Sequence, residues 1–155
     1  MSGFAALAYV QRTTVSVAAP ELQAALQLSK QQVGWLFMAF TAAYAAGQLP
    51  GGALGQRFGP RAVFTGIGLV GVAATLATAL PIYALAGTAL LGVMIVAQAL
   101  LGLGQGPVFP VFATVVERWF PSRQFALANG SISSMMLLGG ALTPPLLVTL
   151  TAAVG

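Results

Sequence analysis

Cysteine and histidine are absent from this chain, and charged residues make up only 5% of it. Without cysteine there are no disulfides and no thiolate metal ligands, and without histidine the commonest general base and metal ligand is missing. We therefore expect no cofactor and no metal site. A soluble globular domain carries about 25% charged residues, so this scarcity of charge excludes water as the main solvent and indicates a lipid bilayer.

Long apolar stretches separate the few charged residues. From Ala62 to Val116 no side chain is charged. As one helix this stretch would be about 80 Å long at 1.5 Å per residue, against a hydrocarbon core of about 30 Å, so it must turn back, and we expect this near Leu80-Pro81. The runs are much longer than the roughly ten-residue strands of a membrane barrel. Helices satisfy their own backbone groups, and the expected fold is an all-α membrane protein, a helical bundle.

Five transmembrane helices are predicted, over residues 1–19, 33–55, 62–80, 87–116 and 125–150, with linkers at 20–32, 56–61, 81–86 and 117–124. The cations concentrate in alternate linkers, with Arg57 and Arg61 in the second and Arg118 and Arg123 in the fourth. Because basic residues favour the cytoplasmic side, these two linkers and the N-terminus are predicted to be cytoplasmic, in a multi-pass protein of the cell inner membrane. The formal net charge of +4 then reflects topology and gives no reason to expect nucleic acid.

Arg12 is the only charged residue among residues 1–19. An arginine in the middle of a membrane helix costs at least about 2.5–3.5 kcal/mol. The two acids of the chain, Glu21 and Glu117, do not lie near it in the sequence. This pattern indicates that its partner is a ligand, most simply a small organic anion. The alternatives are that Arg12 snorkels to the cytoplasmic face or pairs with a missing half of the protein.

Glycine and proline are dense at one place in the fourth predicted helix, at Gly102, Gly104, Gly106, Pro107 and Pro110. Such a cluster is expected to interrupt the helix, and irregular backbone at membrane depth is tolerated only inside protein or beside a cavity. We interpret this cluster as lining a pathway. The glycines of the second and third helices are interpreted as sites of close helix packing.

Residues 52–61, GALGQRFGPR, resemble the loop between the second and third helices of the major facilitator superfamily, which usually reads G-x-L-a-D-R-x-G-x-[RK]. Residues 9–20 and 100–110 resemble the first and fourth helices of its anion:cation symporter branch, the carriers of hexuronate, glucarate and phthalate. Trp119-Phe120-Pro121 and residues 140–146 resemble the W-F-P and G-P-P-L signatures of that branch. The resemblance runs nearly from end to end, with the motifs in the family's order.

The resemblance implies the N-terminal half of a two-half transporter fold, here with about five of its six helices. We therefore expect a truncated piece or an incomplete reading frame, whose partner is a missing C-terminal half. The implied function is secondary transport of a small organic anion, such as a sugar acid, by alternating access. The implied gating loop comprises Gly52, Gln56, Arg57, Gly59 and Arg61.

Four residues form the candidate substrate site: Arg12, Tyr44, Gln105 and Asn129. Arg12 would bind the anion, and the other three would offer neutral hydrogen bonds. The alternatives are a lipid-facing or core aromatic at Tyr44, a helix-packing contact at Gln105, and ordinary interhelical hydrogen bonding by the polar patch at Asn129 and the serines that follow it.

The chain departs from the family at four positions where charge is usual. Gln11 and Gln56 replace aspartate, Gln98 replaces arginine and Gln105 replaces glutamate. By resemblance, acids at positions 11 and 105 would handle the coupled proton. Because glutamine does not titrate, proton-coupled symport through these two positions is predicted to be weakened or lost.

Two other functions compete with transport. An intramembrane hydrolase would need histidine, cysteine or paired acids at depth, and the only lysine, Lys30, lies in a linker, so we do not expect an enzyme. A non-transporting membrane scaffold, or a half-length bundle that dimerises, is the remaining alternative.

Overall fold

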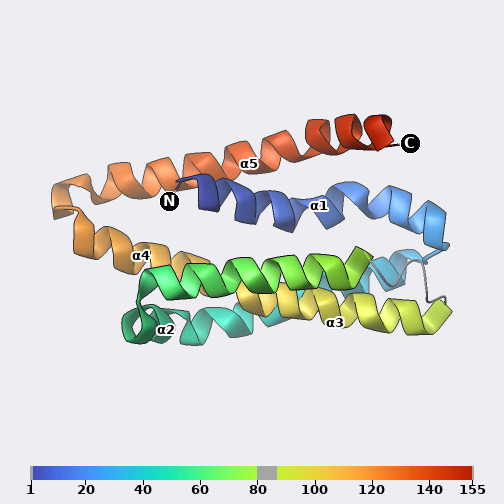
Figure 1. Cartoon of the computed structure of the whole chain (residues 1–155), viewed down its shortest axis with the longest axis horizontal. Helices are drawn as coiled ribbons and strands as arrows, with labels where there is room; N and C mark the ends of the chain where they lie inside the picture. Colours follow the sequence, from blue (N-terminus) through green and yellow to red (C-terminus); the bar gives the residue numbers. More distant parts are fainter. Residues whose placement is uncertain (1, 80–86, 155) are drawn as a thin grey trace. The chain divides into compact units, whose positions relative to one another are not determined.

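The structure, a computed structural model, describes residues 2–79 and 87–154. Its elements are α1 (Ser2–Leu26), α2 (Lys30–Ala79), α3 (Gly87–Gln105), α4 (Val108–Trp119), the short 3-10 helix η2 (Ser122–Gln124) and α5 (Phe125–Val154), as Figure 1 shows. The all-α class is confirmed. The predicted linker 81–86 lies outside the described residues. The helices form two compact units, one of α1 with η2 and α5, the other of α2, α3 and α4.

Three helical stretches of the described residues are long and apolar enough to cross a membrane: Lys30–Thr78, Gly87–Trp119 and Ser122–Leu150. The first has 49 residues and contains two of the predicted spans, because the chain reverses within it. The second joins α3 and α4. Since α1 is not among these stretches, a membrane crossing by residues 1–19 stays a prediction.

In the first unit, α1 continues through Pro20 to Leu26, whereas the sequence prediction begins a linker at Pro20. A proline inside a helix removes one backbone hydrogen bond. The leucine, glutamine and alanines at 22–25 have high helix propensity, and the helix continues through them. It ends before Gln27, whose φ of 51° is the left-handed conformation that commonly terminates helices.

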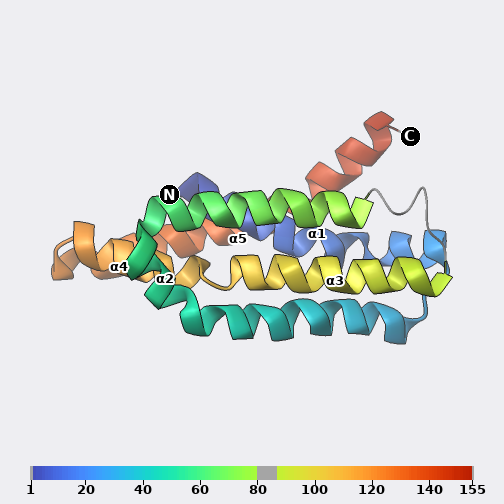
Figure 2. The same cartoon turned by 60° about the horizontal axis from the view of Figure 1, so that its bottom comes forward.

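Helices α1 and α5 run side by side and parallel (Figures 1 and 2). The buried face of α5 recurs every three or four residues and consists of Ala128, Ile132, Met136, Gly139 and Thr143. A Cβ at Gly139 would collide with the backbone of Ala6, so glycine permits this close approach. Small residues at such an interface are typical of helices that pack in a membrane.

In the second unit, α2 contains one non-helical residue, Gly59, with φ 78° and ψ 154°. A glycine adopts this conformation at little cost because it has no Cβ. The chain reverses here, so that residues 30–58 and 60–79 form two limbs with α3 between them (Figure 2). The first limb begins with a capping box, in which the Gln32 backbone N–H donates to Ser29 Oγ and the Ser29 N–H donates to Gln32 Oε1.

The expected interruption of the fourth predicted helix is confirmed at Gly106-Pro107, where α3 ends and α4 begins. Backbone hydrogen bonds flank the break closely, since the N–H of Gly106 donates to the carbonyl of Gly102 at 2.9 Å and that of Val111 donates to the carbonyl of Pro107 at 3.0 Å. The irregular backbone is therefore confined to two residues, and α4 continues the path to Trp119.

The glycines at this break pack against α2. A Cβ at Gly102 would collide with the carbonyl oxygen of Phe40, and one at Gly106 would lie 2.6 Å from the carbonyl carbon of Gly47. Real Cβ atoms essentially never come that close to another heavy atom. The structure therefore assigns Gly102 and Gly106 to close helix packing, while the lining of a pathway by this cluster stays a prediction.

Candidate functional site

Arg12 lies on α1 with its side chain exposed. Its guanidinium carbon is 5.8 Å from the centroid of the Tyr9 ring, a distance at which a cation is attracted to an aromatic face. Residues three apart on a helix are surface neighbours, and Tyr9 is half-buried, so the ring gives the long arginine side chain a fixed surface. An exposed guanidinium offers up to five N–H donors in a planar fork that matches a carboxylate.

The residue after Arg12 links α1 to α5. Thr13 Oγ1 lies 2.8 Å from Thr143 Oγ1, and Thr143 is fully buried and donates to the carbonyl of Gly139 at 2.9 Å. The next residue along α5, Gly140, would place a Cβ 3.0 Å from the Tyr9 ring. The backbone that carries Arg12 is therefore held against α5 by a hydrogen bond and by close packing.

Asn129 is exposed on α5 and does not lie beside Arg12. Because Gly139 meets Ala6 and the helices are parallel, Asn129 lies ten residues before this contact and Arg12 six residues after it. At 1.5 Å per residue these positions are about 24 Å apart along the helices. A small ligand at Arg12 would not reach Asn129 within this unit, and its substrate contact stays a prediction without geometric support.

Tyr44 and Gln105 come from two segments that pack against each other in the second unit. The Tyr44 ring stacks on Phe40, with centroids 5.9 Å apart and planes at 16°, and adjoins a small core of Phe40, Ala74 and Leu101. Gln105 is 4% exposed and precedes Gly106, which lies against the backbone of Tyr44. The core alternative for Tyr44 thus has direct support, while substrate contact by either residue stays a prediction.

Gln98 and Gln105 are seven residues apart on the buried face of α3. In the described part of the chain, no buried side-chain nitrogen or oxygen lacks a hydrogen-bond partner. Both glutamines are therefore accommodated as neutral amides inside the second unit.

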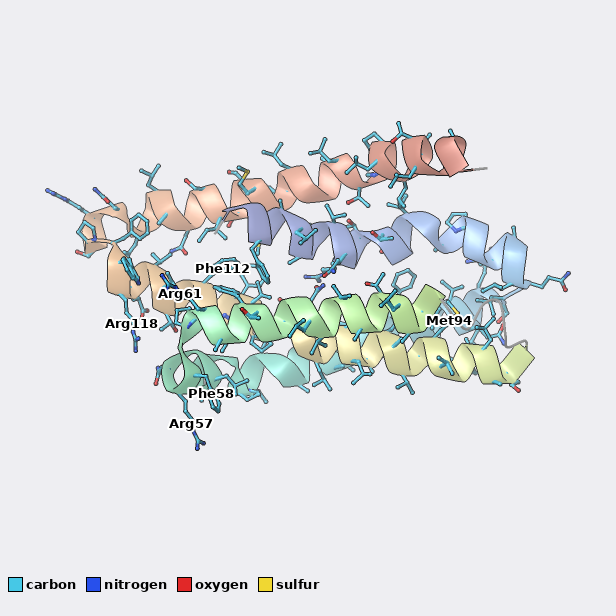
Figure 3. All side chains as sticks on the ribbon, viewed as in Figure 1. Arg57, Phe58, Arg61, Met94, Phe112 and Arg118 are labelled. Atoms are coloured by element: carbon cyan, nitrogen blue, oxygen red, sulfur yellow. The ribbon has the colours of Figure 1, made fainter. Side chains whose placement is uncertain are left out.

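The predicted gating loop surrounds the reversal at Gly59. Gln56, Arg57 and Arg61 are exposed, and the guanidinium carbon of Arg57 lies 5.4 Å from the centroid of the Phe58 ring. Figure 3 shows Arg57 and Arg61 at the same end of this unit as Arg118 of α4. Gly52 faces open space. The clustering of three arginines at one end is what the predicted cytoplasmic placement of these linkers requires, although the gating role itself stays a prediction.

Three residues near Arg12 were missed as site components. Tyr9 could have been found from its spacing of three residues, which places it beside Arg12 on a helix. The pairing of Thr13 with Thr143 could not, because these residues are 130 positions apart and only the packing of α1 on α5 brings them together.

The family model described as Major Facilitator Superfamily matches residues 1–155. The chain is 36% identical over 149 residues to the probable sulfoacetate transporter of Cupriavidus necator. The aligned region covers 96% of this chain and 33% of that protein. It is 34% identical over 151 residues to the probable galactarate/D-glucarate transporter of Escherichia coli strain K12, with 97% and 34% covered. It is 31% identical over 143 residues to the hexuronate transporter of Bacillus subtilis strain 168, with 89% and 31% covered.

These relatives are all named for organic anions, in agreement with the branch that the motifs indicate. The chain spans about a third of the length of each of them.

Proposed function

Because the chain belongs to the Major Facilitator Superfamily, we propose that it forms the N-terminal part of a secondary transporter for a small organic anion, a carboxylate such as a sugar acid. The observation that carries this proposal is Arg12, the only cation before Lys30, exposed on α1 beside Tyr9. The names of the relatives, for sulfoacetate, glucarate and hexuronate, support the same class of substrate.

The proposed role of Arg12 follows from its chemistry. Its planar fork binds a carboxylate through two parallel N–H donors, and these hydrogen bonds are strong where water is scarce. The Thr13–Thr143 hydrogen bond and the Tyr9 ring would hold the fork in one orientation. Alternating access would come from rocking of the two transporter halves.

Uptake by vesicles that contain the full-length gene product tests this proposal. Labelled glucarate, glucuronate and sulfoacetate are each compared with glucose, a neutral sugar of similar size. We expect uptake of at least one anion above empty vesicles and none of glucose, because glucose lacks the group that Arg12 binds. Uptake of glucose alone, or of none of the four compounds by well-folded protein, would contradict the proposal.

A further inference from the structure

An apolar groove of about 410 Å³ lies in the second unit, between the two limbs of α2 and the junction of α3 with α4. No polar side chain lines it, and its walls include Leu54, Phe58, Val63, Gly66, Val70 and Leu103. The groove opens to the surroundings, since Phe58 is 58% exposed and Leu103 is 46% exposed. Its volume lies within the roughly 300–1,000 Å³ of ordinary ligand pockets.

The groove spans most of one membrane leaflet. Its lining residues on the second limb run from Ala62 to Val70, which at 1.5 Å per residue is about 12 Å. Half of a hydrocarbon core of about 30 Å is roughly 15 Å. An extended acyl chain that enters beside Gly59 would therefore follow the groove most of the way to the middle of the bilayer.

Positive charge adjoins the Gly59 end of the groove. Arg57 and Arg61 are exposed, and each immediately precedes a residue that lines it, Phe58 or Ala62. The guanidinium of Arg57 lies over the Phe58 ring, which keeps the charge near the entrance, and Figure 3 labels both arginines at this end of the unit. The only acid of this unit's sequence is Glu117.

We propose that the second unit binds one anionic phospholipid, whose acyl chain lies in the groove and whose phosphate pairs with Arg57 and Arg61. Lipid tails are as apolar as the groove, so apolar contact alone does not distinguish a bound lipid from its neighbours. The groove sets the position of the lipid, and the arginines select the headgroup. Each arginine near a membrane surface contributes a preference for anionic lipid of about fivefold. This site does not depend on what the protein transports.

Native mass spectrometry of the full-length protein, released from nanodiscs of equal phosphatidylglycerol and phosphatidylcholine with identical acyl chains, tests the proposal. We expect one retained phosphatidylglycerol per chain. The double variant Arg57→Gln/Arg61→Gln should lower the preference for phosphatidylglycerol by about 25-fold, the product of two fivefold terms. Arg118→Gln removes a charge from the same end of the unit but adjoins no lining residue, and should have little effect.

A second pair of variants tests the groove itself. Gly66 lines the groove, and a Cβ there would meet nothing within 4 Å, so Gly66→Leu fills the groove without a clash at its Cβ. Gly68 lies on the same limb, has equally open space and does not line the groove, so Gly68→Leu is the matched control. We expect Gly66→Leu to lower phosphatidylglycerol retention severalfold and Gly68→Leu to leave it unchanged.

Any one of three results would contradict the proposed lipid site. Equal retention of the two lipids by the unsubstituted chain would remove the role of the arginines. An effect of Arg118→Gln as large as that of the double variant would indicate diffuse surface attraction. A lipid-free dimer would show that a second copy covers the groove. If circular dichroism shows that Gly66→Leu has lost its helical structure, the exposed arginine pair decides the outcome.

Discussion

At the residue scale, Arg12 is positioned by its neighbours on both sides in the sequence. Tyr9, three residues before it, offers its ring to the guanidinium. Thr13, directly after it, is hydrogen-bonded to the buried Thr143 of α5. Long side chains lose conformational entropy when they bind a ligand. A guanidinium that is already held in place loses less, so these neighbours favour binding.

We predict that Arg12→Gln abolishes uptake of organic anions by the full-length protein, and that Arg12→Lys restores only part of it. Lysine keeps the charge but lacks the planar fork that holds a carboxylate bidentately. Initial rates of uptake into vesicles, corrected for the amount of protein in the membrane, measure both variants. Arg118→Gln, which removes an exposed arginine of α4, is the control and should transport normally. Undiminished uptake by Arg12→Gln would remove Arg12 from the site.

Gln11 and Gln105 lead to a second prediction at this scale. Proton symport requires a group that binds a proton in one state and releases it in another, and glutamine cannot do so. We expect an imposed pH gradient to drive little accumulation of anion, provided that the rest of the full-length protein supplies no replacement acid. Uptake with and without the gradient measures this. Strong gradient-driven accumulation that a protonophore abolishes would show that a titrating residue lies elsewhere.

At the scale of elements, glycines set the distance between α2 and α3. Gly47 lies against the carbonyl oxygen of Leu103, and Gly102 and Gly106 lie against the backbone of the first limb of α2. Because lipid gives helices no hydrophobic driving force to associate, their stability depends on such close packing. The two helices therefore tolerate no side chain at these positions.

We predict that Gly102→Ala lowers the thermal midpoint of the protein in detergent, whereas Gly92→Ala does not. The Cβ at position 102 would collide with the Phe40 carbonyl, while the one at 92 meets nothing within 4 Å. Overpacking of this kind typically costs about 1–3 kcal/mol, and alanine at an open helical position is favourable by about 0.5–1 kcal/mol over glycine. Equal midpoints for the two variants would show that α2 and α3 do not pack as described.

The helices could largely be predicted from the sequence because their apolar runs are long. The predicted spans 33–55 and 62–80 correspond to the two limbs of α2, which meet at Gly59. Proline was a less reliable guide to where helices end, since α1 continues through Pro20 while α3 ends just before Gly106-Pro107. The effect of a proline depends on the neighbours that replace its lost hydrogen bond. The contact of Thr13 with Thr143 beside Arg12 was beyond prediction, because only the packing of α1 on α5 brings these two residues together.

At the scale of the whole chain, three arginines bear on its orientation in the membrane. Arg57, Arg61 and Arg118 share one end of the second unit (Figure 3), and the positive-inside rule predicts that this end is cytoplasmic. The absence of native cysteine allows this orientation to be measured with single introduced thiols.

We predict that Gln56→Cys is labelled by an impermeant thiol reagent from the cytoplasmic side only, and that Gln31→Cys is labelled from the periplasmic side only. Both side chains are exposed, and neither change removes a charge that determines topology. Labelling of intact cells, compared with inverted membrane vesicles, measures the accessible side. Labelling of Gln56→Cys in intact cells would reverse the topology and place the N-terminus outside.

The pairing of α1 with α5 also has a consequence for biogenesis. Thr13 and Thr143 are 130 residues apart, and at about 5–20 residues synthesised per second the ribosome needs roughly 6–26 s to make the second after the first. During this delay α1, with Arg12, has no α5 to pack against, while the contiguous second unit can already assemble. We therefore expect the nascent α1 to depend on the insertion machinery or a membrane chaperone until α5 emerges. A crosslinker placed at position 6 should react with that machinery in short nascent chains, and with the region of Gly139 once α5 has been made.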